Sequence, residues 1–257
     1  MKSTILSGKD ANLIEKAILK YGRILSVRDL MVIFQEEYSA TSAHNRISLL
    51  ARAGWFRRLK QGLYLIIDSL TARSQVDISL LSIANALVED SYVSLSHALN
   101  YYQLFDQYSP SVISVTAKES KKYLFDNFTF KYSKVKPDMY FGFTKKIVNG
   151  KEVRLAEPEK ALIDYLYLDR SFSSASWVFE KLRDHHQALD VNKLQIYAIQ
   201  SGITLQRKIG FMLDTLKLDC FRIYQAVKEN RGATHFTRDA RVFNAKWRLY
   251  YDDRIIG

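Results

Sequence analysis

Positively charged side chains gather in a stretch of the sequence that contains no acidic residue. Between Glu37 and Asp68 there is no Asp or Glu. Five cations fall in this stretch, namely Arg46, Arg52, Arg57, Arg58 and Lys60. Because a carboxylate beside a phosphate cancels much of the attraction that a nearby guanidinium provides, an acid-free stretch favours binding of a polyanion. The chemistry that these residue types indicate is contact with nucleic-acid phosphates.

The segment that ends at Gly54 is expected to be a helix with two different faces. At about 100° per residue, Ala43, Ile47 and Leu50 share the apolar face. The opposite face and its flanks carry the candidate DNA-contacting residues Thr41, Ser42, Asn45, Arg46, Ser48 and Arg52. Asn can bind adenine and Arg can bind guanine through paired hydrogen bonds, and small hydroxyl residues let a helix sit deep in a major groove. Leu49 also faces outward, where it either touches a thymine methyl group or packs under the segment that follows.

A basic β-hairpin is predicted directly after this helix. Residues 55–59 and 63–67 have the composition of two strands, and Lys60-Gln61-Gly62 has that of a turn. The cations of the hairpin are suited to phosphates or to a minor groove. The hairpin therefore adds four candidates to the DNA-contacting set, namely Arg57, Arg58, Lys60 and Gln61.

Two further amphipathic helices are expected before the basic segment. Ala17 and Tyr21 share one face of the first, and Gly22 is a natural stop. Ser26, followed three residues later by Asp29, predicts a capping box that starts the second. These three helices and the hairpin are the elements that must position the candidate residues.

Three helices followed by a basic hairpin predict a winged helix-turn-helix DNA-binding domain over residues 1–70, with a polar linker over residues 68–75. The helix that ends at Gly54 would then be the recognition helix, and the hairpin would be the wing. An alternative stays open, because winged helices also serve as protein–protein modules and an exposed basic helix face is often only solvated.

The rest of the chain predicts a second, effector domain over residues 71–257, which makes the fold class α+β. Up to about residue 170 helices and strands mix, with a two-residue hairpin turn at Asn149-Gly150 and a helix that begins at Pro158. Strands are expected over residues 112–115, 128–132 and 139–143. Beyond residue 170 the chain is mainly helical, with breaks near Asp190, Gly202 and Leu218.

A second basic region falls inside this effector domain. Its lysines alternate with aromatic residues and outnumber its acids; they are Lys118, Lys121, Lys122, Lys131, Lys134, Lys136, Lys145 and Lys146. The region is either a surface for a nucleic acid or an acidic partner, or a strand core with solvated lysines. The second interpretation is favoured.

Composition bounds the partners and the compartment. The 257 residues include 38 Lys and Arg against 27 Asp and Glu, so the formal charge of +11 attracts nucleic acid first and anionic membranes second. The single cysteine, Cys220, excludes an intrachain disulfide and a thiolate metal site. No segment resembles a signal peptide or approaches the roughly 18 apolar residues of a membrane span. A cytoplasmic protein with no membrane partner, metal or cofactor is expected.

The catalytic constellations in the chain are weak, so no enzymatic activity is expected. Asp138, followed by Glu152 and Arg154, faintly resembles the acidic core of a metal-dependent nuclease. Those sites use a lysine after the second acid, whereas an arginine stays protonated and cannot share a proton usefully. His97 has no acid placed to orient it, and the chain has no glycine-rich phosphate loop.

Three segments resemble the antitoxins of abortive-infection (AbiE-type) type IV toxin–antitoxin systems. Residues 53–64, AGWFRRLKQGLY, are similar to the wing of that family. Residues 92–99, YVSLSHAL, are similar to its strand-then-helix segment after the linker, and residues 155–164, LAEPEKALID, to its later helix entry. The resemblance covers roughly residues 10–170, and the order of the segments carries more weight than any one of them.

This resemblance implies a regulator that represses its own operon by binding double-stranded operator DNA at inverted repeats. It also implies a C-terminal domain that counteracts a nucleotidyltransferase-class toxin, with or without direct contact, and it leaves dimerisation on the DNA open. Arg57, Arg58 and Lys60 match the basic wing of the family. The alternative is a stand-alone winged-helix regulator whose rear domain senses a small molecule.

The last of the three segments also has a purely physical interpretation, which is preferred. Pro158 presets the first helical turn, Glu157 and Glu159 complement the helix dipole, and Ala161 and Leu162 pack.

Overall fold

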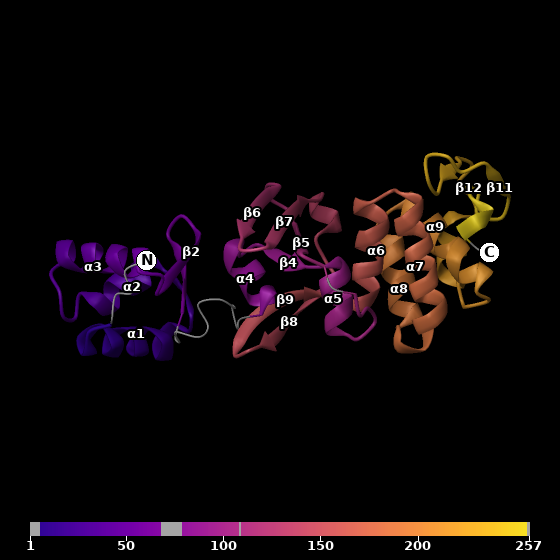
Figure 1. Cartoon of the computed structure of the whole chain (residues 1–257). Helices are drawn as coiled ribbons and strands as arrows, with labels where there is room; N and C mark the ends of the chain where they lie inside the picture. Colours follow the sequence, from indigo (N-terminus) through magenta and orange to yellow (C-terminus); the bar gives the residue numbers. More distant parts are fainter. Residues whose placement is uncertain (1–5, 68–78, 108, 256–257) are drawn as a thin grey trace.

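The computed structural model describes residues 6–67, 79–107 and 109–255, and it has a mixed α+β fold (Figure 1). The N-terminal helices lie at one end, a six-stranded sheet lies in the middle, and helices continue to the other end. The predicted linker, residues 68–75, lies entirely outside the described residues.

The N-terminal unit consists of three helices and a small antiparallel sheet. In chain order these are α1 (Gly8–Tyr21), β1 (Ile24–Ser26), α2 (Val27–Phe34), α3 (Ala40–Arg52), β2 (Phe56–Lys60) and β3 (Leu63–Ile66). The strands pair in the order β1-β3-β2. All three predicted helices and the hairpin are present, and β1 is an additional strand that was not predicted.

Local capping explains where these helices start. The Ser26 side chain accepts the backbone N–H of Asp29, and Asp29 accepts the backbone N–H of Ser26, so the predicted capping box is confirmed. Ser39 caps α3 in the simpler way, by accepting the N–H of Ser42. Gly22 follows α1 with a φ of +80°, a conformation that favours glycine.

The hairpin is packed on both of its faces. One face belongs to the N-terminal core, where Phe56 and Ile66 lie with apolar residues of α1, α2 and α3. The other face contributes Leu59, Leu65 and Ile67 to the larger core of the chain. Ordinary alternation along the strands places these residues on opposite faces, and the pairing has a register shift between Arg58 and Lys60. The hairpin therefore joins the two halves of the molecule.

A six-stranded mixed sheet forms the middle of the chain. Its strands are β4 (Ser91–Val93), β5 (Ser111–Thr116), β6 (Lys121–Phe125), β7 (Phe128–Lys134), β8 (Phe143–Val148) and β9 (Lys151–Ala156), in the order β6-β7-β5-β4-β9-β8. Helices α4 (Leu80–Leu87) and α5 (Leu95–Tyr101) pack against it. Asn149 and Gly150, both with positive φ, form the predicted two-residue turn between β8 and β9.

Two details of this region differ from the sequence prediction. The strand expected over residues 139–143 is absent there. Pro137–Met139 instead forms a short 3-10 turn, and Gly142, with a φ of +71°, packs its backbone against Lys160 before β8 begins at Phe143. Strand β6 was not predicted at all, because only Phe125 of its five residues is buried. Its pattern lacks the alternation that marks a half-buried strand.

The C-terminal part is mainly helical, as expected, and the predicted breaks are confirmed. Its helices are α6 (Pro158–Leu168), α7 (Phe172–His185), α8 (Val191–Gln200), α9 (Ile203–Thr215) and α10 (Phe221–Val227). A small sheet of β10 (Thr234–His235), β12 (Leu249–Tyr251) and β11 (Val242–Asn244) closes the chain. Among the described residues, no helix is both long enough and apolar enough to cross a bilayer.

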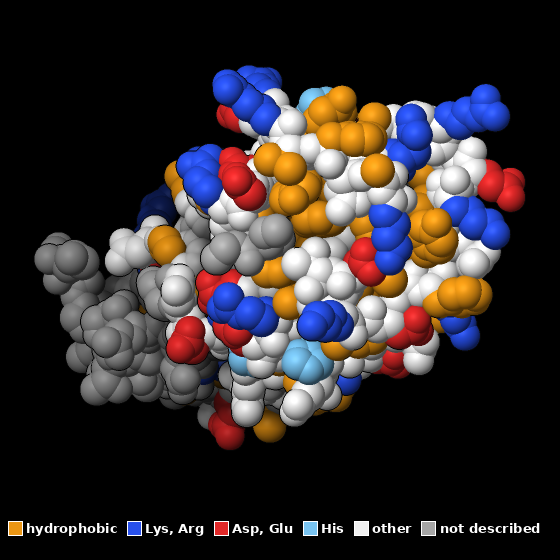
Figure 2. Space-filling model, turned by 90° about the vertical axis from the view of Figure 1, so that its right-hand side faces the viewer, with side chains coloured by type: hydrophobic (Ala, Val, Ile, Leu, Met, Phe, Trp, Pro, Cys, Tyr) orange, Lys and Arg blue, Asp and Glu red, His pale blue; other side chains and the backbone are white. Residues whose placement is uncertain are grey.

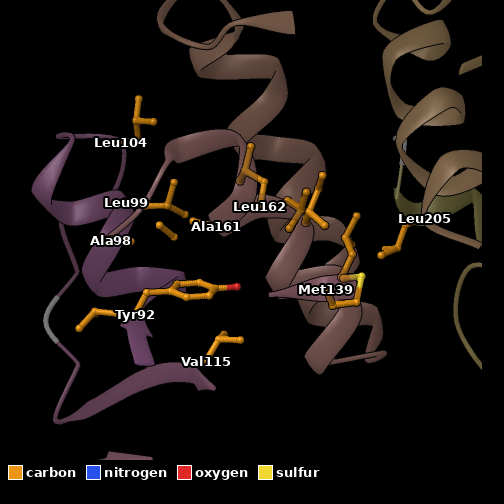
Figure 3. Packing of buried hydrophobic residues seen from close by; sticks show 14 of the residues in the cluster. Tyr92, Ala98, Leu99, Leu104, Val115, Met139, Ala161, Leu162 and Leu205 are labelled. Atoms are coloured by element: carbon orange, nitrogen blue, oxygen red, sulfur yellow. The ribbon is translucent and has the colours of Figure 1, made fainter. Parts of the chain in front are cut away.

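A buried ion pair on α6 is hydrogen-bonded to residues in and directly after strand β4. Lys160 and Asp164, one turn apart on α6, pair with no exposure to solvent. The Asp164 carboxylate also accepts hydrogen bonds from the hydroxyls of Tyr92 (3.1 Å) and Ser94 (2.7 Å). Figure 3 shows the Tyr92 ring among buried apolar side chains, with its hydroxyl pointing toward the helix that carries Ala161 and Leu162.

The physical interpretation of the 155–164 segment agrees with these contacts. Pro158 occupies the first turn of α6, and Ala161 and Leu162 are buried. Glu157 accepts hydrogen bonds from Lys193 and Tyr197 of α8, and Glu159 accepts the backbone N–H of Asp190. The two acids therefore anchor α8 as well as facing the start of α6.

Candidate nucleic-acid interface

Helix α3 presents the two faces that its sequence predicts. Ala43, Ile47 and Leu50 are buried. Four of the candidate residues are exposed on the other side, namely Thr41, Ser42, Asn45 and Arg52, and Ser48 is half-buried. Leu49 is 41% exposed. It therefore does not pack under the hairpin, which was one of the two positions expected for it. The exposed face offers short polar side chains with hydrogen-bonding groups.

Arg46 is not available on this face. Its guanidinium donates to both carboxylate oxygens of Asp10, with a Nε–Oδ1 distance of 2.8 Å, and the Asp10 side chain is completely buried in the first turn of α1. Burial alone would raise the pKa of Asp10, but hydrogen bonds from Arg46 and Ser7 hold that pKa below its usual value. The ion pair of Arg46 and Asp10 therefore holds α3 against α1. Removing Arg46 would leave a buried carboxylate without its cation.

Arg57 is neutralised by an acid from the other half of the chain. It forms an ion pair with Asp126, in the turn between β6 and β7, and its guanidinium lies 4.8 Å from the ring centre of Phe125. The prediction of a surface undiluted by carboxylates is therefore wrong at Arg46 and Arg57. The acid-free stretch is acid-free along the chain only, since Asp10 and Asp126 approach it in space.

Lys60 also makes a structural contact. Its ammonium donates to the carbonyl oxygen of Leu87, the last residue of α4, at 2.7 Å. A cation at this end of a helix satisfies a free carbonyl and complements the helix dipole. Its neighbour Gln61 is exposed in the turn, where Gly62 has a φ of +75°. The hairpin is thus held at Arg57 and Lys60, while Arg58 and Gln61 remain exposed.

A depression of about 640 Å³ lies between the C-terminal end of α3, the hairpin and the β6–β7 turn. Arg52, Arg57 and Arg58 line it, and Asp126 is the one acid among its described lining residues. Within the described part of the chain, Arg52 and Arg58 form no ion pair. Seven of the lining residues were missing from the sequence-based set, and Tyr64, Leu124, Phe125 and Asp126 are the ones that lie beyond α3 and β2. No local pattern marks them, because three of them come from a strand and turn about 70 residues away.

The basic surface continues from this depression along the sheet. Lys122 and Leu124 lie on the same face of β6, and Lys122 pairs across the strands with Lys131 of β7. Both lysines are exposed, whereas Phe130 and Tyr132 are buried beneath the sheet. This arrangement agrees with the interpretation favoured from the sequence, a strand core with solvated lysines. It also places Lys122 and Lys131 on the sheet face that carries Leu124, which lines the depression.

Comparison with known proteins supports the fold and gives no family. No family model matches the chain, and no curated protein matches it. Among solved structures, the crystal structure of the RV2827C protein from Mycobacterium tuberculosis is similar, with a TM-score of 0.62. The match covers 96% of this chain and 92% of that chain at 14% sequence identity. The two chains therefore share a fold over almost their whole lengths.

No metal centre accompanies the basic surface in the described ranges, since no three His, Cys, Asp or Glu side chains gather as possible metal ligands. The arrangement offers hydrogen-bond donors and acceptors on a helix and, beside them, the guanidinium groups of Arg52 and Arg58, which pair with no described acid. It can hold an anionic polymer against α3 by charge, and it can contact base edges from the exposed helix face.

Proposed function

We propose that this chain is a DNA-binding transcriptional regulator whose N-terminal unit is a winged helix-turn-helix. The order of elements, three helices with a first strand after α1 and a hairpin after α3, is the order of that motif. The observation that carries the proposal is the face of α3, where Thr41, Ser42 and Asn45 are exposed and Arg52 continues the face toward Arg58.

The candidate residues divide into three groups by proposed role. Ser42 and Asn45, with Thr41 at the edge, would contact bases in a major groove, since they are short, exposed and polar. Arg52, Arg58 and Gln61, with Ser48 at the margin, would contact the phosphate backbone. Arg46, Arg57 and Lys60 would act indirectly, because their contacts set the angle between α3, the hairpin and the sheet.

A binding titration tests this function. The full chain should bind a duplex taken from the region upstream of its own coding sequence at least about tenfold more tightly than an unrelated duplex of equal length and base composition. Fluorescence anisotropy at near-physiological salt measures both affinities. Equal affinities for the two duplexes would remove the regulatory role, and no binding of either would remove the DNA-binding role.

We further propose that the chain acts in the cytoplasm as the antitoxin of a type IV toxin–antitoxin pair. The support is the resemblance of three segments to that family, two of which meet in space. Tyr92 and Ser94, both in the first of these two, donate to Asp164 in the second, and strands β4 and β9 pair in parallel at Val93 and Leu155. Co-expression with the product of a neighbouring nucleotidyltransferase-like reading frame tests the role, and growth arrest that this chain fails to relieve would contradict it.

A further inference from the structure

A second candidate site lies in the C-terminal part, far from α3. A cavity of about 720 Å³ opens between the end of α6, the start of α9 and the segment that follows β10. Of its described lining residues three are cations, namely Arg170, Lys208 and Arg238, and none is acidic. Figure 2 shows this end of the molecule, where Lys and Arg side chains, with some Asp and Glu, lie among apolar ones. Such a lining attracts an anion.

The N-terminus of α9 also favours a bound anion. Its N-cap is Gly202, which has a φ of +90° and provides no side chain to cap the helix. The first-turn amides of Ile203 and Thr204 donate to no partner in the described part of the chain. Free amides and the positive end of the dipole at the N-terminus of a 13-residue helix favour a bound anion. Thr204 and Thr237 add hydroxyl groups to the lining, whereas the hydroxyl of Ser201 donates to the carbonyl oxygen of Tyr197.

Lys208 is the independent observation that points to a ligand. It is 3% exposed, lines the cavity and lies four residues after Thr204, so both project from the same face of α9. No hydrogen bond or ion pair with a described residue involves its ammonium, which lies 5.2 Å from the ring centre of Phe236. Burial and the neighbouring charge of Arg170 lower the pKa of Lys208 to about 8. An almost buried cation without a counter-charge is costly, and a bound anion would remove that cost.

The lining also indicates the size and charge of the anion. Cations, free amides and hydroxyls together suit a dianionic phosphoryl group better than a single carboxylate. Leu166, Ile203 and Phe236 supply apolar walls for an organic part, and the volume lies in the range of small-molecule sites. The backbone of a duplex cannot follow a side chain that is 3% exposed into a cavity. The observations therefore favour a small molecule over a nucleic acid.

We propose that this cavity binds a small phosphate monoester, whose phosphoryl group contacts Lys208, Arg170 and the first-turn amides of α9. The site does not depend on the proposed DNA binding. In a regulator it would be the place where the rear half of the chain receives a small-molecule signal.

Isothermal titration of the full chain with inorganic phosphate, ribose 5-phosphate and adenosine monophosphate, in phosphate-free buffer of low ionic strength at pH 7, tests the proposal. We expect saturable binding at one site for at least one of the two esters. Lys208→Met should weaken that binding at least about tenfold, because the ammonium is the deepest cation of the cavity. Lys228→Met, which removes an exposed lysine at the end of α10, should bind as the unmodified chain does.

A second variant keeps the test decisive if Lys208→Met does not fold. Arg170→Gln changes an exposed residue and should weaken binding severalfold. Absence of saturable binding up to about 10 mM ester would overturn the proposal, because this range also detects binding too weak for a specific site. Unchanged affinity in both variants would also overturn it, as would displacement of the ester by a short duplex. Operator binding should be the same in Lys208→Met and in the unmodified chain, so the failure of this site and the failure of the DNA-binding role are distinguishable.

Discussion

At the scale of single residues, the cations of this chain differ in their ion-pair partners and in their burial. Arg46 neutralises a buried acid, Arg57 neutralises a partly exposed one, and Arg52 and Arg58 are paired with no acid in the described ranges. Lys160 has a buried partner, whereas Lys208 is almost as buried and has no ion-pair partner among the described residues. The same residue type therefore has a structural role at one position and is suited to binding an anion at another.

Asp126→Asn tests whether the ion pair withholds Arg57 from DNA. Freeing this guanidinium should strengthen binding to any duplex by a few-fold and should steepen the dependence of log affinity on log salt by up to about 0.9, the value for one additional neutralised phosphate. Stability should change by less than about 1 kcal/mol, since the pair is partly exposed. Anisotropy titrations at several salt concentrations measure the effect. An unchanged slope would mean that Arg57 does not face the duplex.

Lys160→Met tests the anchoring role of the α6 segment. The variant leaves the Asp164 carboxylate buried without its cation, which should lower the free energy of unfolding by about 3–5 kcal/mol. Adding Asp164→Leu should restore part of this loss, since the uncompensated charge is then gone. Urea denaturation followed by circular dichroism compares the three chains. A loss below about 1 kcal/mol in the single variant would show that the pair contributes little.

Lys208→Met should make the protein more stable near pH 7, by about 1–3 kcal/mol, because it removes a nearly buried and unpaired charge. The folded-state pKa of about 8 lies below the ordinary value of 10.5, so the unfolded chain holds more protons between these values. The free energy of unfolding of the unmodified chain should therefore rise from pH 8 to pH 10.5 by more than that of Lys208→Met. Denaturant titrations of both proteins from pH 8 to pH 10.5 measure this difference. Parallel plots of unfolding free energy against pH would refute the lowered pKa of Lys208.

At the scale of elements, the sequence predicted what depends on local spacing. The faces of α3, the capping box at Ser26 and the turn at Asn149-Gly150 follow from residues within a few positions of one another, and all are confirmed. The second packed face of the hairpin was missed, because Leu59 and Leu65 pack against elements distant in the chain. The partner of Arg57 was missed for the same reason, since Asp126 lies 69 residues away.

The exposed face of α3 should determine which DNA sequence is bound. Ser42→Ala with Asn45→Ala removes hydrogen-bonding groups without changing charge, so affinity for the specific duplex should fall about tenfold or more. Affinity for an unrelated duplex and the salt slope should stay nearly constant. Competition titrations with both duplexes measure this. An equal loss of affinity for the two duplexes would show that these side chains serve general binding instead.

At the scale of the whole molecule, the hairpin couples the two halves of the chain. Three of its apolar residues belong to the larger core, Lys60 bonds to the end of α4, and Lys151 donates to the carbonyl of Tyr21. The predicted division at residues 70 and 71 would therefore cut the larger core away from Leu59, Leu65 and Ile67. Both proposed activities are best tested in the full chain, where the hairpin keeps its two packed faces.

The proposed function requires that DNA lies against α3 and the two unpaired arginines beside it. Its decisive test compares the salt dependence of duplex binding for the unmodified chain, for Arg52→Ala with Arg58→Ala, and for Lys228→Ala with Arg231→Ala. The last pair removes the same charge from exposed positions in the C-terminal part. We expect the first pair alone to weaken binding to specific and unrelated duplexes alike and to flatten the slope by up to about 0.9 for each phosphate that is no longer neutralised. Equal slopes and affinities in all three proteins would contradict this placement of the DNA.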